Sequence, residues 1–290
     1  MVLQYPWGAH NIFAMKTPEI TSTSNPLVKK ILRLQQKLAE RKNSGLFVVE
    51  GRREVSLALR SGVRVAHLLV CPQIYTADAA YPVDLDGEAG RTLVEVSRAV
   101  YDKLAYRENK EGIMLVAGKQ LPVLDQIILK PDPLVLVLEA VEKPGNLGAI
   151  LRTADAAGMD AVLICDPGTD VFNPNVIRSS LGCVFTVPIT VCQPDEATDW
   201  IRRLPAGPSG KKPKILAAAL QKASDYYLED LAGPTALVFG AEDKGLSAHW
   251  REHADALVRI PMSGSIDSLN VSVSVAILAF DAVRQRRTGK

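Results

Sequence analysis

Long apolar runs are missing from this 290-residue sequence, which nowhere approaches the roughly 18 uninterrupted apolar residues of a membrane span. Residues 1–15 also lack the basic and apolar segments of a secretion signal. Cysteine is scarce, and its four residues show no C-x-x-C spacing, which favours neither a zinc site nor a disulfide framework. We therefore expect a soluble cytoplasmic protein, without metal or membrane contacts, whose reduced thiols lie in the core: Cys71, Cys165, Cys183 and Cys192.

Net charge is also low, at +2, and by itself predicts no nucleic-acid partner. Its distribution is uneven, because residues 16–60 contain ten Lys or Arg against four Glu. Such a segment indicates an anionic partner at one end of the molecule. The first fourteen residues, in contrast, carry no charged side chain. We expect residues 1–16 to form a disordered extension.

The basic segment contains a predicted helix with a clear start. Asn25 is a typical capping residue, Pro26 suits the first helical position, and apolar residues recur at helical spacing through Leu38. Four basic residues follow at steps of four, which places them along one side of the helix: Lys29, Arg33, Lys37 and Arg41. We expect them to contact the anionic partner, although a solvated helix face fits the same pattern.

The other apolar runs predict two α/β domains. Runs at 47–49, 65–70, 92–96 and 113–117 alternate with helical segments, which indicates a small domain over residues 17–120. Three prolines mark residues 121–133 as a linker. Beyond it the runs lack polar alternation, as in parallel strands covered on both faces: 134–138, 161–165, 183–187, 215–218 and 236–239. Residues 134–290 are therefore predicted to form a parallel-sheet domain.

Two glycine-containing loops follow apolar runs near the C-terminus. The first is Gly240–Gly245, after 236–239, and the second is Ile260–Asn270, after 256–259. Open α/β sheets hold ligands at such strand ends. Neither loop is a phosphate motif, because Leu246 stands where a P-loop needs lysine and no G-x-G-x-x-G is present. Taken singly, each loop also fits an ordinary turn.

A third motif, upstream of these loops, completes a combination of three that is typical of one protein family. Residues 146–154 read N-x-G-x-x-x-R-T-A, residues 240–245 read G-x-E-x-x-G, and residues 260–273 read I-P-M-x-G-x-x-x-S-L-N-V-S-V. In this order and spacing the chain resembles the SpoU (TrmH-like, SPOUT superfamily) RNA ribose methyltransferases over residues 17–287. The resemblance implies methylation of a ribose 2′-OH in RNA with S-adenosylmethionine as cofactor. It also implies a deep trefoil knot in the C-terminal α/β domain, an exception among folds, and an RNA-docking N-terminal domain.

The resemblance assigns site residues. Four line the cofactor pocket with backbone polar groups and apolar walls: Gly240, Ile260, Met262 and Leu269. Arg152 takes the position of the catalytic arginine. A free arginine is neutral in only about one molecule in 10⁵ at pH 7, so its use as a base costs roughly 7 kcal/mol. Either its pKa is strongly lowered, or it stays charged, binds a phosphate and stabilises the developing alkoxide, which we favour.

The remaining polar site residues implied are Asn146, Glu242, Ser268 and Asn270. Asn146 is expected to position Arg152 or a partner's loop, and Glu242 to hold the pocket or the arginine. The family also implies a homodimer in which Arg152 reaches the other subunit's pocket. The apolar residues that follow Leu269 occupy more than one helix face, so a two-fold interface is expected to cover part of them.

Alternative functions stay open at this point. His249 and His253 stand in H-x-x-E-H, a zinc-peptidase pattern, but no third ligand follows on a clear second helix. A non-catalytic RNA-binding assembly factor would keep the fold and lose the chemistry. Among RNA substrates, rRNA of the large subunit is preferred to tRNA because residues 17–119 suit a full docking domain. DNA is not expected.

Overall fold

The computed structural model describes residues 19–84 and 93–288. The chain divides into two compact units, residues 1–119 and 120–290. The predicted extension over residues 1–16, and Thr92 at the start of a predicted strand, lie outside the described residues. Among the helices described, none combines the length and the apolar character that crossing a membrane requires.

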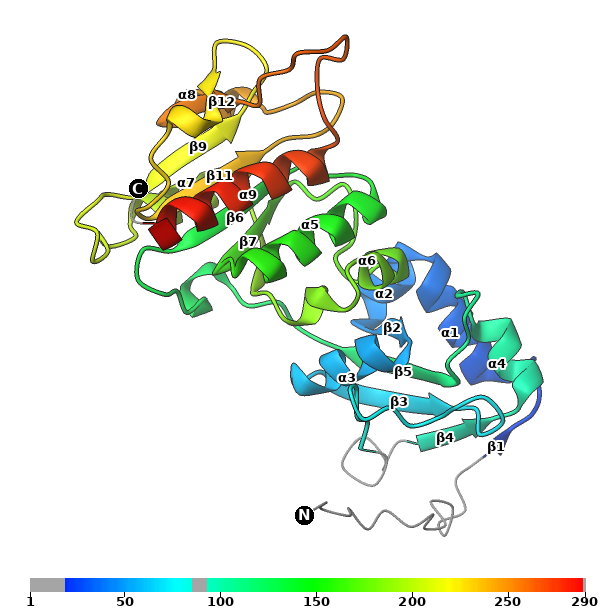
Figure 1. Cartoon of the computed structure of the whole chain (residues 1–290). Coiled ribbons are helices and arrows are strands. Elements are labelled where there is room, and N and C mark those ends of the chain that lie inside the picture. Colours follow the sequence, from blue (N-terminus) through cyan, green and yellow to red (C-terminus); the bar gives the residue numbers. More distant parts are fainter. Residues whose placement is uncertain (1–18, 85–92, 289–290) are drawn as a thin grey trace, which may run out of the picture. The chain divides into compact units, whose positions relative to one another are not determined.

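The first unit is built on a mixed five-stranded sheet with the order β1-β4-β3-β5-β2 (Figure 1). Its strands are β1 (Glu19–Ile20), β2 (Phe47–Glu50), β3 (Arg64–Val70), β4 (Leu93–Val96) and β5 (Ile113–Gly118). Its helices are α1 (Pro26–Gln36), α2 (Leu38–Ser44), α3 (Arg52–Arg60) and α4 (Arg98–Leu104). The four strands predicted here are confirmed, whereas β1 was not predicted. Val28, Ile31 and Leu34 of α1 are fully buried in the core of this unit.

The predicted continuous basic helix is wrong in its second half. Asn25 caps α1 as predicted, by accepting from the amide of Leu27. At Lys37, however, the backbone is extended, and a separate helix, α2, begins. Arg41 folds back, and its Nη1 donates to the carbonyl of Leu34 at 2.7 Å. Because the last carbonyls of a helix lack partners within it, this bond ends α1 and leaves Arg41 only 7 % exposed.

The second unit contains a seven-stranded, wholly parallel sheet with the order β10-β12-β9-β11-β6-β7-β8. The strands are β6 (Leu134–Glu139), β7 (Ala161–Cys165), β8 (Ile189–Cys192), β9 (Lys214–Ala218), β10 (Ser224–Asp225), β11 (Thr235–Phe239) and β12 (Ala256–Arg259). The helices are α5 (Pro144–Ala157), α6 (Pro174–Ser179), α7 (Pro194–Arg202), α8 (Ala248–His253) and α9 (Val271–Thr288). The predicted parallel-sheet α/β domain is thus confirmed, and the trefoil knot stays a prediction.

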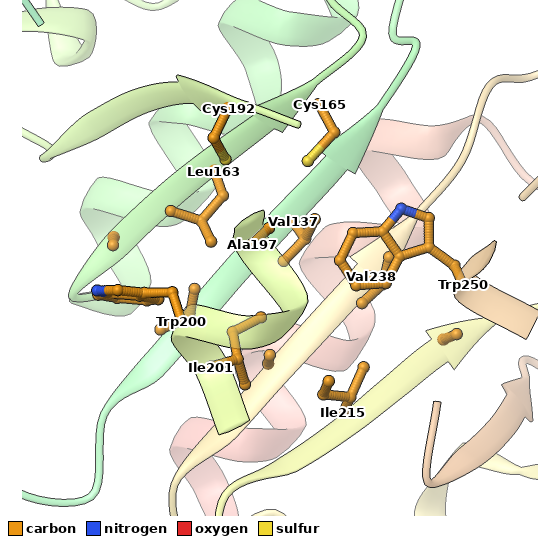
Figure 2. Packing of buried hydrophobic residues seen from close by; sticks show 14 of the residues in the cluster. Val137, Leu163, Cys165, Cys192, Ala197, Trp200, Ile201, Ile215, Val238 and Trp250 are labelled. Carbon is orange, nitrogen blue, oxygen red and sulfur yellow. The ribbon is translucent and has the colours of Figure 1, made fainter. Parts of the chain in front are cut away.

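Helices cover both faces of this sheet. Trp200 of α7 and Trp250 of α8 pack with Val137 of β6 and Val238 of β11 in one buried cluster (Figure 2). Successive side chains of a strand point to opposite faces of the sheet. Leu136, the residue before Val137 in β6, therefore points to the other face. There α5 and α9 lie side by side (Figure 1). The apolar runs lack alternation because both faces are buried.

One predicted strand of the second unit is wrong. Residues 183–187 form the short 3-10 helix η3 (Cys183–Phe185), and the strand follows at β8. Gly182 enters η3 in the left-handed conformation at φ 82°, which turns the chain before the apolar run. Cys183, Val184 and Phe185 are all buried although consecutive. A short apolar run of this kind does not distinguish strand from helix by its pattern.

The segment predicted as a linker, 121–133, contains the 3-10 helix η2 (Leu124–Gln126). Leu124, Ile127 and Leu129 pack against the core of the second unit, so this segment is anchored there. All four cysteines are buried, which confirms their predicted place in the core. Cys165 and Cys192 are neighbours in the register of β7 and β8.

The carboxyl end of α9 is fixed by two polar side chains. Arg286 donates to the carbonyl oxygens of Asp132 at 2.5 Å, Gly233 at 2.6 Å and Leu231 at 3.0 Å. Gln285 accepts from the amide of Leu231 at 2.8 Å. These bonds use carbonyls that precede β6 and β11, so the helix that begins at one end of the sheet is tied down at the other.

Candidate functional site

A cavity of about 580 Å³ lies at the carboxyl ends of β9, β11 and β12. The loops that follow these strands gather at this end of the sheet (Figure 1). Seven of the nine residues predicted for catalysis or cofactor binding line it: Gly240, Glu242, Ile260, Met262, Ser268, Leu269 and Asn270. The order of the strands explains the convergence, because β11 and β12 both neighbour β9.

The glycines of the first loop allow it to fold back on itself. A Cβ on Gly240 would lie 2.3 Å from the carbonyl oxygen of Gly245. Gly245 has φ 64°, and its amide donates to the carbonyl of Ala241 at 2.9 Å. Only glycine fits both requirements without strain. The G-x-E-x-x-G spacing therefore builds a tight backbone turn that presents Glu242 beside the cavity.

A chain of hydrogen bonds joins the three motifs. Glu242 accepts from Asn146 and from Lys143. Asn270 donates from Nδ2 to Oδ1 of Asn146 at 3.2 Å. Its own Oδ1 accepts from the amide of Ser272 at 2.9 Å, which caps α9. The cap at the start of α9 is thus also a site residue, and the motifs fix one another's side chains.

Asn146 was predicted to position Arg152 or a partner's loop, and Glu242 to hold the pocket or that arginine. In the structure Asn146 bonds to Glu242 and to Asn270. Ser268 is exposed at the cavity, whereas Asn270 caps α9. The polar chain therefore organises the pocket edge without including Arg152.

Arg152 lies on α5 with its side chain exposed. It lines neither the 580 Å³ cavity nor a smaller one of about 200 Å³ between residues 140–143 and 241–243. Among the described residues it makes no hydrogen bond and no ion pair. Within a single chain, the predicted catalytic arginine is therefore separate from the predicted cofactor pocket.

The glycine of the first motif has a packing role. A Cβ on Gly148 would lie 1.9 Å from Oγ of Ser179 and 2.7 Å from the amide nitrogen of Ser180. The end of α6 therefore rests directly on the backbone of α5. Ser179 also donates to the carbonyl of Pro144 at 3.2 Å. This contact sets where α5 starts, and with it the positions of Asn146 and Arg152.

Charges of both signs surround the cavity. Arg251 donates from Nε to the carbonyl of Leu246 at 3.1 Å, and Arg259 donates to Asp225 at 2.8 Å. The bond from Arg259 lowers the pKa of the Asp225 carboxyl, and a second bond, from Tyr227, lowers it further. The hydrogen bond and charge of Glu242 raise the pKa of Lys143. The cavity is thus polar at its rim and carries no excess of one sign.

These features fit S-adenosylmethionine. The cavity volume lies within the roughly 300–1,000 Å³ range of small-molecule pockets. Backbone groups at three strand ends suit the adenine and amino acid parts, and apolar residues of the cavity suit the ring and methylene carbons: Phe239, Leu246, Val258, Ile260, Leu269 and Leu278. A mixed rim accommodates a ligand that has a cationic sulfur, an ammonium and a carboxylate.

Several lining residues were missed from the sequence. The last residue of β9 contributes Ala218, the turn after it contributes Ala219, Leu220 and Gln221, and α8 contributes Arg251. The run 215–218 was predicted as a strand, but nothing in the composition of the following turn marked it as a site. The applicable signal was the rule that ligands bind at the carboxyl ends of parallel strands.

The H-x-x-E-H histidines have a local structural role. His249 contacts Thr198 Oγ1 at 2.8 Å through Nε2 and Asp195 Oδ1 at 3.1 Å through Nδ1. The Nδ1 of His253 lies 2.8 Å from the carbonyl oxygen of His249. In the part of the chain that the structure describes, no group of His, Cys, Asp or Glu could hold a metal ion. The contacts of His249 join α8 to α7.

Comparison with known proteins agrees with this geometry. Residues 133–280 match the SpoU rRNA Methylase family, and residues 25–115 match the MRM3-like substrate binding domain. The 23S rRNA (uridine(2479)-2′-O)-methyltransferase of Streptomyces viridochromogenes is 33% identical over 259 residues, with 87% of each chain covered. The 23S rRNA (guanosine-2′-O-)-methyltransferase RlmB of Shewanella oneidensis is 39% identical over 204 residues, which cover 69% of this chain and 80% of that one.

A solved structure extends the likeness to the fold. The SpoU methyltransferase AviRb from S. viridochromogenes, in complex with the cofactor AdoMet, has a TM-score of 0.78 and 30% identity, and covers 92% of this chain and 100% of that chain. The motifs, the cavity where they meet and these similarities lead to one conclusion: the chain belongs to the SpoU rRNA methylase family.

Proposed function

We propose that this protein transfers a methyl group from S-adenosylmethionine to a ribose 2′-OH in large-subunit rRNA. The observation that carries the proposal is the meeting of three distant motifs at one cavity: Glu242, Asn146 and Asn270 bond to one another at its edge. The cofactor supplies an electrophilic methyl group on a positively charged sulfur. Two curated relatives are named for 2′-O-methylation of 23S rRNA, which supports the choice of substrate.

The residues at the cavity have separate roles in binding the cofactor, orienting the ribose and fixing the loops. Gly240, Ile260, Met262 and Leu269 hold the cofactor through backbone groups and apolar contacts. Ser268 is exposed at the cavity and is placed to orient the ribose. The bonds from Glu242 through Asn146 to Asn270 keep the two loops and α5 in one arrangement before substrate arrives. Such preorganisation lowers the cost of orienting the reacting groups.

Arg152 acts as a cation in this proposal. Deprotonating a free arginine at neutral pH costs roughly 7 kcal/mol, so a role as a base is not proposed. A charged guanidinium binds a phosphate through two parallel hydrogen bonds and stabilises negative charge that develops on the 2′-oxygen. Its two roles are therefore to fix the target nucleotide and to stabilise the transition state.

A homodimer brings Arg152 to a cavity. Within one chain it lines neither of the two cavities described above, so we assign it to the pocket of the other subunit. An apolar stripe on α9 supports a two-fold interface: Val273 and Phe280 are 46% and 48% exposed, with the half-buried Ile277 between them. These residues stand at i, i+4 and i+7, on one side of the helix. Because α9 packs beside α5, the stripe and Arg152 share one layer of the unit.

RNA docking is assigned to the first unit. Lys29, Arg33 and Lys37 are exposed and remain proposed phosphate contacts, whereas the buried Arg41 is withdrawn. Arg33 also pairs with Glu40 at 3.3 Å, an exposed contact that a phosphate can replace. The match to a substrate binding domain over residues 25–115 favours rRNA over tRNA. Because its substrate is RNA, we place the protein in the cytoplasm and expect no DNA partner.

Methyl transfer to defined RNAs tests the proposal. The protein is incubated with methyl-labelled S-adenosylmethionine and either in vitro transcribed 23S rRNA or unmodified tRNA. A 2′-O-methyl group blocks alkaline cleavage, so label should appear in alkali-resistant dinucleotides from the rRNA. Label in tRNA alone would show that the substrate is tRNA and not rRNA. Tight cofactor binding without labelling of either RNA would favour the non-catalytic assembly factor.

A further inference from the structure

The junction between β2 and α3 in the first unit has an unusual construction. Gly51, with φ 105°, connects the strand to the helix, and Gly51 has no side chain with which to cap the helix. A Cβ there would lie 2.2 Å from Nη1 of Arg107 and 2.5 Å from Oε2 of Glu54. The amide of Arg52 donates to Glu111 at 2.6 Å instead of to a cap. Charged side chains therefore pack directly on the start of this helix.

Unpaired polar atoms are concentrated at this junction. Among the described residues, six buried side-chain nitrogen or oxygen atoms have no hydrogen-bond partner. Five of the six belong here: Oε1 of Glu50, Oη of Tyr106 and the Nε atoms of Arg52, Arg53 and Arg107. Buried polar groups are almost always paired, and exceptions gather at functional sites. Glu50 is 1 % exposed, so bulk water does not explain its unpaired oxygen.

The three arginines of the junction differ in their ion-pair partners. Arg107 pairs with Glu54. Arg52 lies 3.6 Å from Glu111 and donates to the carbonyl of Thr76 at 2.8 Å. Arg53, in the first turn of α3, has no carboxylate within ion-pair distance in the described part of the chain, and its guanidinium lies 5.5 Å from the ring centre of Tyr81. Among the described residues, Arg53 is thus the one arginine of these three without a counter-charge.

The loop that carries Tyr81 is held against α3. Arg52 donates to Thr76 at one end of it, and Ser56 donates to the carbonyl of Pro82 at 2.9 Å at the other. Arg53 and Tyr81 are therefore arranged side by side before any ligand binds. A guanidinium with free donors suits a phosphate, and an adjacent aromatic face suits an unstacked base.

We propose that this junction is a second RNA contact, in which Arg53 binds a backbone phosphate while Tyr81 stacks on a neighbouring base. The site rests on the proposed function, because it requires an RNA substrate. It is distinct from the exposed basic side of α1, since its residues come from β2, α3 and residues 76–82.

Salt-dependent binding of the full chain to in vitro transcribed 23S rRNA tests this site. Arg53→Gln should weaken binding about tenfold and reduce the slope of log K against log salt by about 1, the change expected for one lost phosphate contact. Tyr81→Leu should weaken binding about threefold or more without changing the slope, because stacking releases no counterion. Arg53→Lys should keep the slope and only part of the affinity.

Arg60→Gln is the matched control, since it removes one exposed positive charge at the other end of the same helix. Circular dichroism and cofactor affinity verify folding of each variant. If Arg53→Gln and Arg60→Gln give equal affinities and slopes, the junction is not an RNA site. Wild-type protein that binds no RNA would overturn the RNA substrate as well, so the two failures are distinguishable.

Discussion

Two strand-to-loop regions, one in each unit, handle their polar groups in opposite ways. At the cavity of the second unit, Glu242, Asn146 and Asn270 bond to one another. At the junction after β2 in the first unit, five buried polar atoms have no hydrogen-bond partner among the residues that the structure describes. A pocket for a small cofactor gains from complete preorganisation, because every misplaced group costs affinity. A surface for RNA leaves donors to the phosphates and bases that the ligand itself brings.

Arg152 does not follow this division. It belongs to a motif of the second unit, yet it is exposed and unpaired among the described residues, like a group that awaits a ligand. The comparison therefore predicts that Arg152 contributes to the reaction and not to the cofactor pocket of its own chain. The following variants test the comparison from the largest expected effect to the smallest.

Arg152→Ala should lower kcat/KM for methyl transfer by about 10³-fold or more, since it removes a charge that stabilises the transition state. Arg152→Lys should fail nearly as badly, because an ammonium cannot bind a phosphate in two places. Calorimetric titration should find cofactor affinity within about twofold of wild type, because the proposed contacts of Arg152 are with the RNA phosphate and the 2′-oxygen and not with the cofactor. Substantial turnover by the alanine variant would remove Arg152 from the reaction.

Gly148→Ala should destabilise the second unit by about 1–3 kcal/mol, because the new Cβ meets Ser179 and Ser180 of α6. Gly145→Ala is the control: it lies in the same helix, and a Cβ there has nothing within 4 Å. That change should be neutral or stabilise slightly. Urea unfolding measures both. Equal stabilities of the two variants would show that α6 does not fix α5 through this glycine.

Asp225, which bonds to Arg259 at the rim of the cavity, should make a small, pH-dependent contribution to the free energy of unfolding. Its folded pKa lies below the usual value because Arg259 and Tyr227 bond to the carboxylate. The stabilisation is therefore present above about pH 4 and is lost as pH falls through the folded pKa. Asp225→Asn should lower the free energy of unfolding at pH 7 and lose this difference at pH 2. A constant difference between these pH values would exclude the carboxylate as its source.

Much of the fold followed from the sequence. Apolar runs without alternation predicted five strands of the second unit, and four of them are present at nearly the predicted bounds. The strand prediction for residues 183–187 was wrong because η3 buries consecutive residues, as a strand covered on both faces also does. The prediction of one continuous basic helix was wrong because a side-chain bond from Arg41 to the carbonyl of Leu34 ends α1 early. Local spacing contains no information about such a bond.

The site was predictable where motifs fix it and not elsewhere. Gly240, Glu242 and Asn270 carry their signal in short loops with defined spacing, and all three line the cavity. The turn after β9 has no motif, so Leu220 and Gln221 appeared only once β9 was seen beside β11 and β12. The placement of Arg152 away from the cavity was expected only from the resemblance, since an arginine on a helix shows no direction in sequence.

The central claim is that each active site combines the pocket of one subunit with Arg152 of the other, and subunit mixing tests it most directly. An Arg152→Ala protein is combined with an Ala219→Trp protein, whose cavity is blocked. Ala219 is preferred to Gly240 because a side chain at Gly240 would collide with the backbone of Gly245.

Each variant alone should be inactive. After exchange, half of the dimers are heterodimers with one intact site, so the account predicts that about one quarter of wild-type methyl transfer returns. If mass spectrometry confirms the heterodimers and activity stays at the level of the separate variants, the shared site is contradicted.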